Sequence, residues 1–315
     1  MQRSYDNGEI AISTGPATGP KAAPVIYCIG NFDGVHPGHL ALINQAKALG
    51  GPVFALTFAP HPRRYFDGET PPFALTNTAQ RDAYLAAAGV QAVRCLPFDA
   101  DLANLSAQDF ARVVLKEKLG VSHVFAGSNF RFGQGRGGDM ALLVHLGTAL
   151  GFAVHPVDLA RAGAREVSSS RIRALLVQGD YREATELWQR NFIVQGPVLK
   201  GDQLGHTLGF ATANLDFGTY LRPAFGVYAS RVTLPDGRRV DSVSNLGRRP
   251  TVDGIQERFE AHLLDFAEDL YGQTLSVELV GFLRREQKFA SLEALKAQIA
   301  VDCEAARTML ATIPR

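Results

Sequence analysis

The order of short apolar runs and amphipathic stretches is the feature that most constrains how this chain can fold. Between Pro24 and about residue 187, apolar runs alternate with helical patterns of about 10 to 13 residues. The apolar runs are Val25–Ile29, Val53–Phe58, Ala92–Leu96, Val121–Ala126 and Phe152–Val157; the helical patterns are Leu40–Leu49, Thr78–Ala88, Ala107–Leu119 and Met140–Leu150. Repeated strand–helix–strand units predict an α/β module with a doubly wound parallel sheet, whose ligand site lies at the carboxyl ends of the strands.

The pattern changes after Trp188, where helical stretches give way to short alternating runs separated by turn residues. The runs are Phe192–Leu199, Val227–Leu234, Val240–Asn245, Phe259–Leu264 and Ser276–Leu283, and one amphipathic helix, Leu292–Leu310, closes the chain. This pattern predicts an antiparallel β-barrel with a closing helix. We therefore expect a disordered leader over residues 1–23 and two domains, over residues 24–187 and 190–315.

Charge and hydropathy exclude several classes of protein. Lys and Arg number 32 and Asp and Glu number 31 among 315 residues, which gives a net charge of +1. This balance argues against nucleic acid or an anionic membrane surface as the main partner. No apolar run approaches the roughly 20 residues that span a bilayer. We expect a cytoplasmic protein that binds neither nucleic acid nor membrane, and the sequence is compatible with a homo-oligomer.

The cysteines and the first residues of the chain also point to the cytoplasm. Cys28, Cys95 and Cys303 lie far apart and form no CxxC pair, which disfavours a zinc site or a disulfide framework. Buried free thiols in a reducing compartment are the simplest expectation. The first 23 residues are polar and lack the apolar core of a signal peptide.

The strongest local motif is GNFDGVHPGH, which follows the first predicted strand and opens the first predicted helix. Pro37 suits the first helical position, and Gly38 allows a ligand to approach the backbone. His36 and His39 are three residues apart, so both imidazoles can face one side of the helix start, where free N–H groups attract anions. The arrangement favours charge stabilisation on an α-phosphate attacked in line. For an isolated HxxH, one capping and one packed histidine would be the simpler interpretation.

A serine-rich turn near the end of the first domain offers a second anion site. Ser168, Ser169 and Ser170 precede Arg171 and Arg173. A serine N-cap exposes backbone donors, while the helix dipole disfavours cations in the first turn. Arginines at these positions suit a bound polyphosphate, although a plain serine cap with solvated arginines remains open.

The stretch GQGRGG at residues 133–138 matches the spacing of a dinucleotide-binding loop, G-x-G-x-x-G. It follows the fourth predicted strand instead of the first, and residues 129–132 intervene between strand and glycines. The glycines therefore do not form the immediate strand-to-helix turn that a nicotinamide site requires. A glycine-rich flap over the substrate is the better interpretation.

The two sets of motifs, taken in order, resemble the bacterial bifunctional riboflavin kinase/FAD synthetase family. The N-terminal set is GNFDGVHPGH, LTFAPHPRRYF, FAGSNFRFGQGRGGD and SSSRIR; the C-terminal set is GHTLGFATANL, FGVYA, NLGRRPT and FEAHLLDFAEDLYG. The resemblance covers about residues 24–310 and implies a Rossmann-like nucleotidyltransferase module followed by a riboflavin kinase barrel.

The resemblance implies two reactions and assigns residues to them. Riboflavin and ATP would give FMN in the C-terminal module, and FMN and ATP would give FAD and pyrophosphate in the N-terminal module. His36 and His39 would act in adenylyl transfer. ATP would be held by Gly30, Asn31, Phe32, Gly38, Ser168, Ser169, Ser170, Arg171 and Arg173, and the flavin would be bordered by Pro60, His61, Pro62, Asn129, Phe130 and Phe132.

In the kinase module, the resemblance assigns Glu260 as general base for the ribityl hydroxyl. Thr212 and Asn214 would hold Mg²⁺, for which oxygen ligands are suitable. The nucleotide and metal would be bound by Gly201, Gly205, Gly209, Thr212 and Asn214. Taken without the resemblance, Glu260 is one polar position in an alternating strand.

The kinase half departs from the family pattern at several positions. Ala211 stands where the family has proline, and Leu204 and His206 stand where arginines are usual. Near the boundary, Trp188-Gln189-Arg190 replaces a Leu-Gly-Arg or Leu-Gly-Tyr sequence. The adenylyltransferase half departs less, with Asn129 where an aspartate is common. We expect weakened ATP binding in a kinase that keeps its metal pair and base. The alternative is a divergent paralogue with adenylyltransferase activity alone, whose barrel senses flavin.

Overall fold

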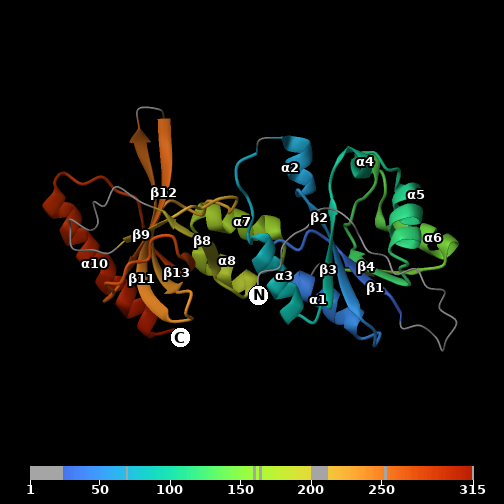
Figure 1. Cartoon of the computed structure of the whole chain (residues 1–315), viewed down its shortest axis with the longest axis horizontal. Helices are drawn as coiled ribbons and strands as arrows, with labels where there is room; N and C mark the ends of the chain where they lie inside the picture. Colours follow the sequence, from blue (N-terminus) through green and yellow to red (C-terminus); the bar gives the residue numbers. More distant parts are fainter. Residues whose placement is uncertain are drawn as a thin grey trace.

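The computed structural model describes residues 24–68, 70–158, 161–162, 165–199, 212–251 and 254–313. The chain forms a sheet-and-helix module and a barrel module, which lie side by side along the long axis of the molecule (Figure 1). The predicted leader, residues 1–23, lies outside the described residues.

The N-terminal module is built on five parallel strands in the order β3-β2-β1-β4-β5. They are β1 (Ile26–Ile29), β2 (Val53–Ala59), β3 (Ala92–Pro97), β4 (His123–Gly127) and β5 (Ala153–Val157). Strand order reverses between β1 and β4, so the loops that follow these two strands diverge there and leave a crevice at their carboxyl ends.

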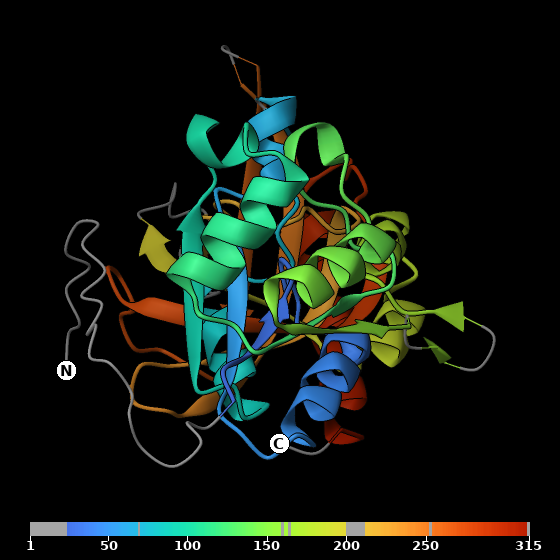
Figure 2. The same cartoon turned by 90° about the vertical axis from the view of Figure 1, so that its right-hand side faces the viewer.

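Helices cover both faces of this sheet. On one face, α1 (Pro37–Lys47) and α3 (Thr78–Ala87) enclose a core that includes Ile43 and Leu85. On the other, α5 (Ala107–Asp109), the π-helix η1 (Phe110–Lys118) and α6 (Met140–Leu150) enclose a second core, and they stand in front of the sheet in Figure 2. The sequence encodes their starts: Asn77 and Gln80 form a capping box, and Ser106 and Asp139 cap the helices that follow them.

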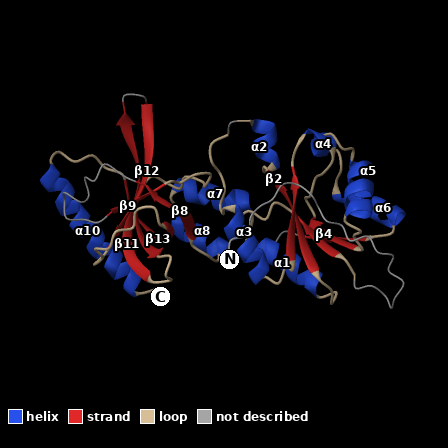
Figure 3. Ribbon diagram, in the orientation of Figure 1, coloured by secondary structure: helices blue, strands red, loops and turns tan. Residues whose placement is uncertain are grey.

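The C-terminal module is a closed barrel in the order β10-β11-β12-β9-β8-β13. Its strands are β8 (Phe192–Leu199), β9 (Thr212–Leu215), β10 (Gly226–Thr233), β11 (Arg239–Thr251), β12 (Gly254–Leu263) and β13 (Thr274–Arg285). Helix α10 (Leu292–Ala311) packs outside the barrel against β10, β11 and β13. Figure 3 shows the contrast between the helix-flanked sheet and the barrel, which consists almost entirely of strands.

Helices α7 (Ser169–Gln178) and α8 (Tyr181–Trp188) lie between the two modules (Figure 1). Their buried side chains, including Leu176 and Trp188, belong to the same apolar cluster as barrel residues such as Phe192 and Leu279. The last two helices before the predicted boundary therefore pack on the barrel core.

The structure confirms the predicted fold class, α/β sheet followed by antiparallel barrel and closing helix. All five predicted strands of the sheet and all five of the barrel are present. The sequence patterns did not indicate strand β9, the short helices α2 (Pro62–Asp67) and α4 (Ala100–Ala103), or the two-residue strands β6 (Arg161–Ala162) and β7 (Arg165–Glu166). Each is too short to carry a periodic signal.

The expectation of buried thiols is correct only for Cys28. Cys95 is exposed and Cys303 is half-buried. Cys95 lies on β3, the edge strand of the sheet, where several side chains remain in solvent. The three described cysteines are all free thiols.

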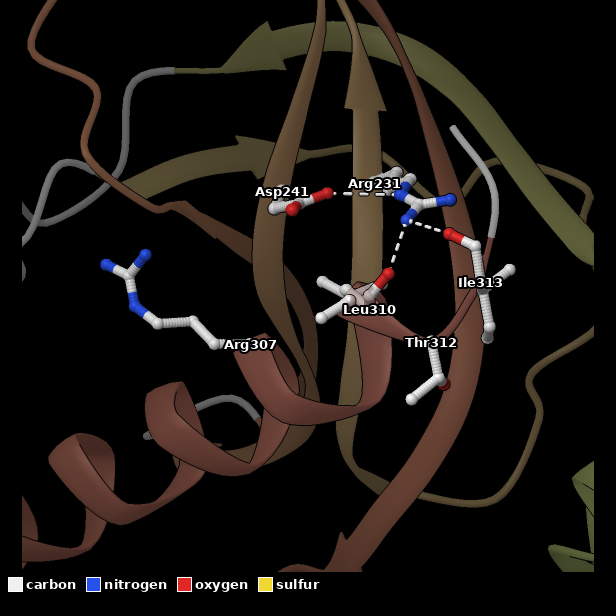
Figure 4. A pocket seen from close by; sticks show the side chains of 7 residues that line it. Arg231, Asp241, Arg307, Leu310, Thr312 and Ile313 are labelled. Carbon is white, nitrogen blue, oxygen red and sulfur yellow. Dashed lines mark hydrogen bonds and ion pairs between the residues drawn. The ribbon is translucent and has the colours of Figure 1, made fainter.

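A cavity of about 540 Å³ lies at the end of the barrel, beside the last turn of α10 (Figure 4). Its main polar wall is Arg231, which is 3% exposed. The guanidinium donates to the carboxylate of Asp241 and to the backbone carbonyls of Leu310 and Ile313. Arg231 therefore ties the end of α10 to the barrel.

None of the helices in the described part of the chain has both the length and the apolar character that a membrane span requires.

Candidate active sites

The loop between β1 and α1 places the two motif histidines at the carboxyl end of β1, the central strand of the sheet. Pro37 occupies the first turn of α1, and the backbone carbonyl of His36 accepts from the N–H groups of His39 and Leu40. The His36 and His39 rings stack with centroids 3.7 Å apart, and the Phe32 ring lies below His39 at 5.1 Å. The predicted placement of both imidazoles on one side of the helix start is confirmed.

Burial disfavours the charged form of both imidazoles, and one nitrogen of each has no partner within the described residues. Burial lowers the pKa of His36 to about 4, with Arg173 acting in the same direction. Burial, the neighbouring His36 and Arg173 hold the pKa of His39 well below its ordinary value. Within the described residues, the buried Nδ1 atoms of His36 and His39 have no hydrogen-bond partner. An anionic ligand would supply both a partner and the charge that stabilises the protonated imidazole.

Asp33, which the sequence analysis did not single out, organises the loop. It is 8% exposed, and its carboxylate accepts from the backbone N–H groups of Leu75 and Thr76 and from the Thr76 hydroxyl, at 2.9–3.2 Å. The Arg173 guanidinium donates to the same carboxylate at 2.5 Å. The motif itself shows an aspartate three residues before the first candidate histidine, but it does not show the partners of that aspartate, which are 42 to 140 residues away.

The serine-rich turn meets the histidine loop in space. The predicted serine cap is confirmed, because the Ser168 hydroxyl accepts from the backbone N–H of Arg171 at 3.3 Å. The Ser169 hydroxyl donates to the backbone carbonyl of Asp33 at 2.9 Å. The N-termini of α1 and α7 therefore converge, and a Cβ on Gly38 would come within 3.5 Å of the Val167 carbonyl. Two converging helix N-termini form a site for anions.

The two arginines of the turn have carboxylate partners within the chain. Arg173 pairs with Asp33 and donates to the Phe73 carbonyl, while Arg171 pairs with Glu183 at 3.2 Å. These carboxylates compensate the positive charge of the two arginines near the N-terminus of α7, so the arginines do not require a bound polyphosphate. The Arg173 and Arg63 guanidinium groups lie 5.3 and 5.2 Å from the Phe73 ring centroid.

The predicted flavin border lies on two loops at the carboxyl ends of the sheet, one after β2 and one after β4, the two strands that flank β1. His61 caps α2, because its Nδ1 accepts from the Arg63 N–H, and burial and Arg173 lower its pKa to about 4. Phe130 and Phe132 stack at 5.7 Å on the loop after β4, where Asn129 is exposed. Pro60 and Pro62 flank His61 at the end of β2 and the start of α2.

An aromatic cluster beside this border was missed from the sequence. Tyr65, Phe66 and Phe98 contact one another edge to face, at 5.2 to 5.6 Å. Phe66 is 61% exposed, although it is a large apolar side chain. The sequence did contain an indication of this cluster, because the Tyr65-Phe66 pair lies close to the predicted border residues Pro60, His61 and Pro62.

The glycines of the GQGRGG stretch serve packing in the loop before α6. A Cβ on Gly133 would lie 2.6 Å from the Ala107 backbone nitrogen, and one on Gly138 would lie 2.8 Å from the Phe132 ring. Between them the chain forms a short 3-10 turn, Gln134–Arg136. This close packing explains Gly133 and Gly138 without a dinucleotide, and Gly135 has a φ of 61°, which glycine tolerates.

The predicted kinase residues share one face of the β9–β12 ladder. In the register, Asn214 pairs with Glu260 and Thr212 pairs with His262, so these four side chains point to the same side. The alternate residues, such as Ala213 and Phe259, face the barrel core. On the next strand Asn245, another residue that sequence reasoning missed, also pairs with Glu260.

This face combines oxygen donors with partial burial. Thr212, Asn214, Asn245 and Glu260 are all half-buried, and the Glu260 carboxylate lies 3.8 Å from the Arg258 guanidinium. Hydroxyl, amide and carboxylate oxygens of this kind suit Mg²⁺. The predicted phosphate-loop residues Gly201, Gly205 and Gly209, and the departures at Leu204, His206 and Ala211, lie outside the described residues.

Comparison with known proteins agrees with two candidate sites, one in each module. Residues 20–171 match the family model of FAD synthetase, and residues 188–310 match that of riboflavin kinase. The bifunctional riboflavin kinase/FMN adenylyltransferase of Escherichia coli K12 is 41% identical over 281 residues, which cover 88% of this chain and 90% of that protein. The chain belongs to this bifunctional family.

Other members and one solved structure extend the similarity over both modules. The Pseudomonas fluorescens bifunctional riboflavin kinase/FMN adenylyltransferase is also 41% identical, over 93% of this chain and 95% of the relative. A Streptococcus pneumoniae crystal structure titled as a macrolide-efflux protein has a TM-score of 0.81 and 28% identity, covering 91% of this chain and 95% of that one. The similarity thus extends over both modules of a single chain.

Proposed function

We propose that this chain phosphorylates riboflavin to FMN at the β9–β12 face and adenylylates FMN to FAD at the β1–α1 loop. The single observation that carries the proposal is the presence of two separate sites in two modules, each matching its own half of the bifunctional family. The riboflavin, FMN and ATP of that family are the small-molecule substrates. We propose residues 24–187 and 190–315 as the corresponding units.

In adenylyl transfer, an FMN phosphate oxygen attacks the α-phosphorus of ATP and pyrophosphate leaves. His36 and His39 are stacked with buried, unpartnered nitrogens, so their N–H groups are available to the oxygens on which charge develops. The converging N-termini of α1 and α7 would hold the triphosphate. Gly30, Asn31, Gly38 and Ser168–Arg173 would line this region, and positioning of the reacting groups would supply most of the catalysis.

We propose that the flavin of FMN lies across the loops after β2 and β4. Pro60, His61 and Pro62 form one side, and Asn129, Phe130 and Phe132 form the other. The exposed Phe66 extends the first side with an apolar ring surface. An isoalloxazine ring is flat and aromatic, so stacking on such rings would stabilise it.

In the kinase reaction, the terminal ribityl hydroxyl attacks the γ-phosphorus of ATP and ADP leaves. Glu260 would accept the hydroxyl proton, and Thr212 and Asn214 would hold Mg²⁺ and phosphate oxygens. Mg²⁺ bound there would neutralise charge on the phosphates. The sequence departs from the family pattern at Leu204, His206 and Ala211, and we therefore propose weaker ATP binding than in a member with arginines at the first two positions and proline at the third.

The proposal favours bifunctionality over a paralogue whose barrel only senses flavin. The chain is similar to enzymes that are named for both activities, and this similarity includes the riboflavin kinase domain. The polar residues of the β9–β12 face also fit a metal and phosphate site. Because its co-substrate ATP is a cytoplasmic metabolite, we place the protein in the cytoplasm.

Labelled ATP separates the two reactions in one experiment. The full chain is incubated with riboflavin, Mg²⁺ and ATP labelled at either the α- or the γ-phosphate, and flavins are separated by chromatography. The γ-label should enter both FMN and FAD, the α-label should enter FAD only, and pyrophosphate should equal FAD. FAD formation only when FMN is supplied would reject the kinase half. Flavin binding without product would support the sensor.

A further inference from the structure

The turn that precedes His36 is strained. Phe32, Gly34 and Val35 have φ values of 53°, 81° and 41°. Glycine tolerates this left-handed region, but a β-branched valine and a phenylalanine do so only where surrounding contacts fix the backbone. The turn ends directly at His36, so its conformation sets the position of the two stacked imidazoles.

One of the contacts that fix the turn comes from the barrel side of the molecule. The indole N–H of Trp188 donates to the Gly34 carbonyl at 2.7 Å, and Trp188 is 1% exposed. A Cβ on Gly34 would lie 3.1 Å from the indole nitrogen, so the two groups are in tight contact. At the same residue, the Gly34 N–H donates to the Thr76 hydroxyl at 3.1 Å.

Trp188 itself is held by the kinase module. It is the last residue of α8, and its ring packs with Phe192, the first residue of β8, at 6.2 Å between centroids. Both belong to the apolar cluster that fills the barrel. Two residues further, Arg190 donates to the Val35 carbonyl at 3.4 Å. The barrel therefore contacts the histidine turn at two consecutive carbonyls.

We propose that Trp188 is a positioning residue for adenylyl transfer, through which the barrel module holds the turn that places His36 and His39. The inference rests on the proposed function for the identity of the reaction. Loss of the indole N–H would leave the buried Gly34 carbonyl without its donor and release one anchor of a strained turn. The histidines would then lose their alignment with the reacting phosphate.

The test removes the N–H while keeping the shape. Trp188 is the only tryptophan in the chain, so a tryptophan auxotroph can replace it uniformly with benzothienylalanine, in which sulfur takes the place of N–H. In the full-length protein, we expect kcat for FAD formation to fall about ten-fold, because small misplacements of reacting groups are costly. The KM for FMN and the rate of FMN formation from riboflavin should stay within two-fold, about the scatter expected of such assays. Trp188→Phe should behave similarly.

The matched control is Phe192→Leu, which disturbs the packing around Trp188 and leaves its N–H in place. It should lower thermal stability and spare kcat for FAD formation at a temperature where both variants are folded. Equal losses of kcat in the two proteins, or a parallel loss of FMN formation, would reduce Trp188 to a packing residue and overturn the proposal. So would unchanged kcat in the benzothienylalanine protein.

A second readout does not depend on turnover. In protein labelled with ¹³C-histidine, the ring resonances of His36 and His39 should shift in the benzothienylalanine protein and remain in place in Phe192→Leu. If the unmodified chain forms no FAD, the proposed function fails, whereas this comparison still decides whether Trp188 positions the histidines. Unshifted resonances would reject the positioning role.

Discussion

Asp33→Asn tests whether a buried carboxylate holds the histidine loop together. One carboxylate oxygen accepts from the Leu75 and Thr76 N–H groups and the Thr76 hydroxyl, and the other accepts from Leu75 and from Arg173. An asparagine amide would direct an N–H₂ group at one of these donor sets. The side chains of Arg173 and Asp33 are only 14% and 11% exposed, so the remaining guanidinium would be nearly buried without its charge partner. Breaking such a pair costs about 3–5 kcal/mol.

The assay is urea denaturation followed by far-ultraviolet circular dichroism, with Asp265→Asn as control. The Asp265 carboxylate accepts two hydrogen bonds from the Arg307 guanidinium, but the side chain of Asp265 is 75% exposed. Solvent screens that pair, so the control should lose at most about 1 kcal/mol. Asp265 has a φ of 55°, a conformation that asparagine tolerates. A loss for Asp33→Asn below about 1 kcal/mol, or equal to that of the control, would refute the assignment of Asp33 as the organiser of the loop.

Three further outcomes follow from the sites. Because the folded-state pKa of buried His36 is lowered to about 4, the unfolded chain binds more protons at this residue than the folded chain between pH 6.5 and 4. His36 alone should lower the free energy of unfolding by up to about 3 kcal/mol as pH decreases through this window, and His39 and His61 should add to that fall, measured by urea denaturation across pH. The His36→Gln variant should show a shallower fall, and an unchanged slope would contradict the assignment. Phe66→Ala should raise KM for FMN roughly five-fold, as loss of a stacking ring is worth about 1 kcal/mol, and leave KM for riboflavin unchanged in steady-state assays; equal changes in both would contradict a flavin site there. Glu260→Gln should lower kcat for FMN formation by about 10²–10⁴-fold as a lost general base; a loss below ten-fold would reject that role.

The periodicity of apolar residues in the sequence was sufficient to predict the fold class of both modules. The buried strands of the sheet and the alternating strands of the barrel carry strong patterns, and capping residues such as Ser168 and Asp139 mark helix starts directly. The four residues of β9 carry too short a pattern to be recognised as a strand. The edge position of Cys95 depends on strand order, which the local sequence does not encode.

The sites were predictable only where motif residues lie close in sequence. His36 and His39 could be paired from their spacing, whereas Asp33 and Arg173 are 140 positions apart and meet only in the folded chain. The same holds for Trp188 and Gly34, which are 154 positions apart. Asn245 joins Glu260 through strand register alone. Contacts of this kind form only in the folded chain, so the local sequence does not indicate them.

The most direct test of two independent sites in one chain is a mixing experiment with His39→Ala and Glu260→Gln. Each variant alone should form almost no FAD from riboflavin and Mg-ATP, because one lacks adenylyl transfer and the other lacks phosphorylation. His39→Ala should still accumulate FMN, and Glu260→Gln should still convert supplied FMN. An equimolar mixture should therefore form FAD from riboflavin at a readily measured rate. Failure of the mixture, or loss of both reactions in either variant, would contradict the account.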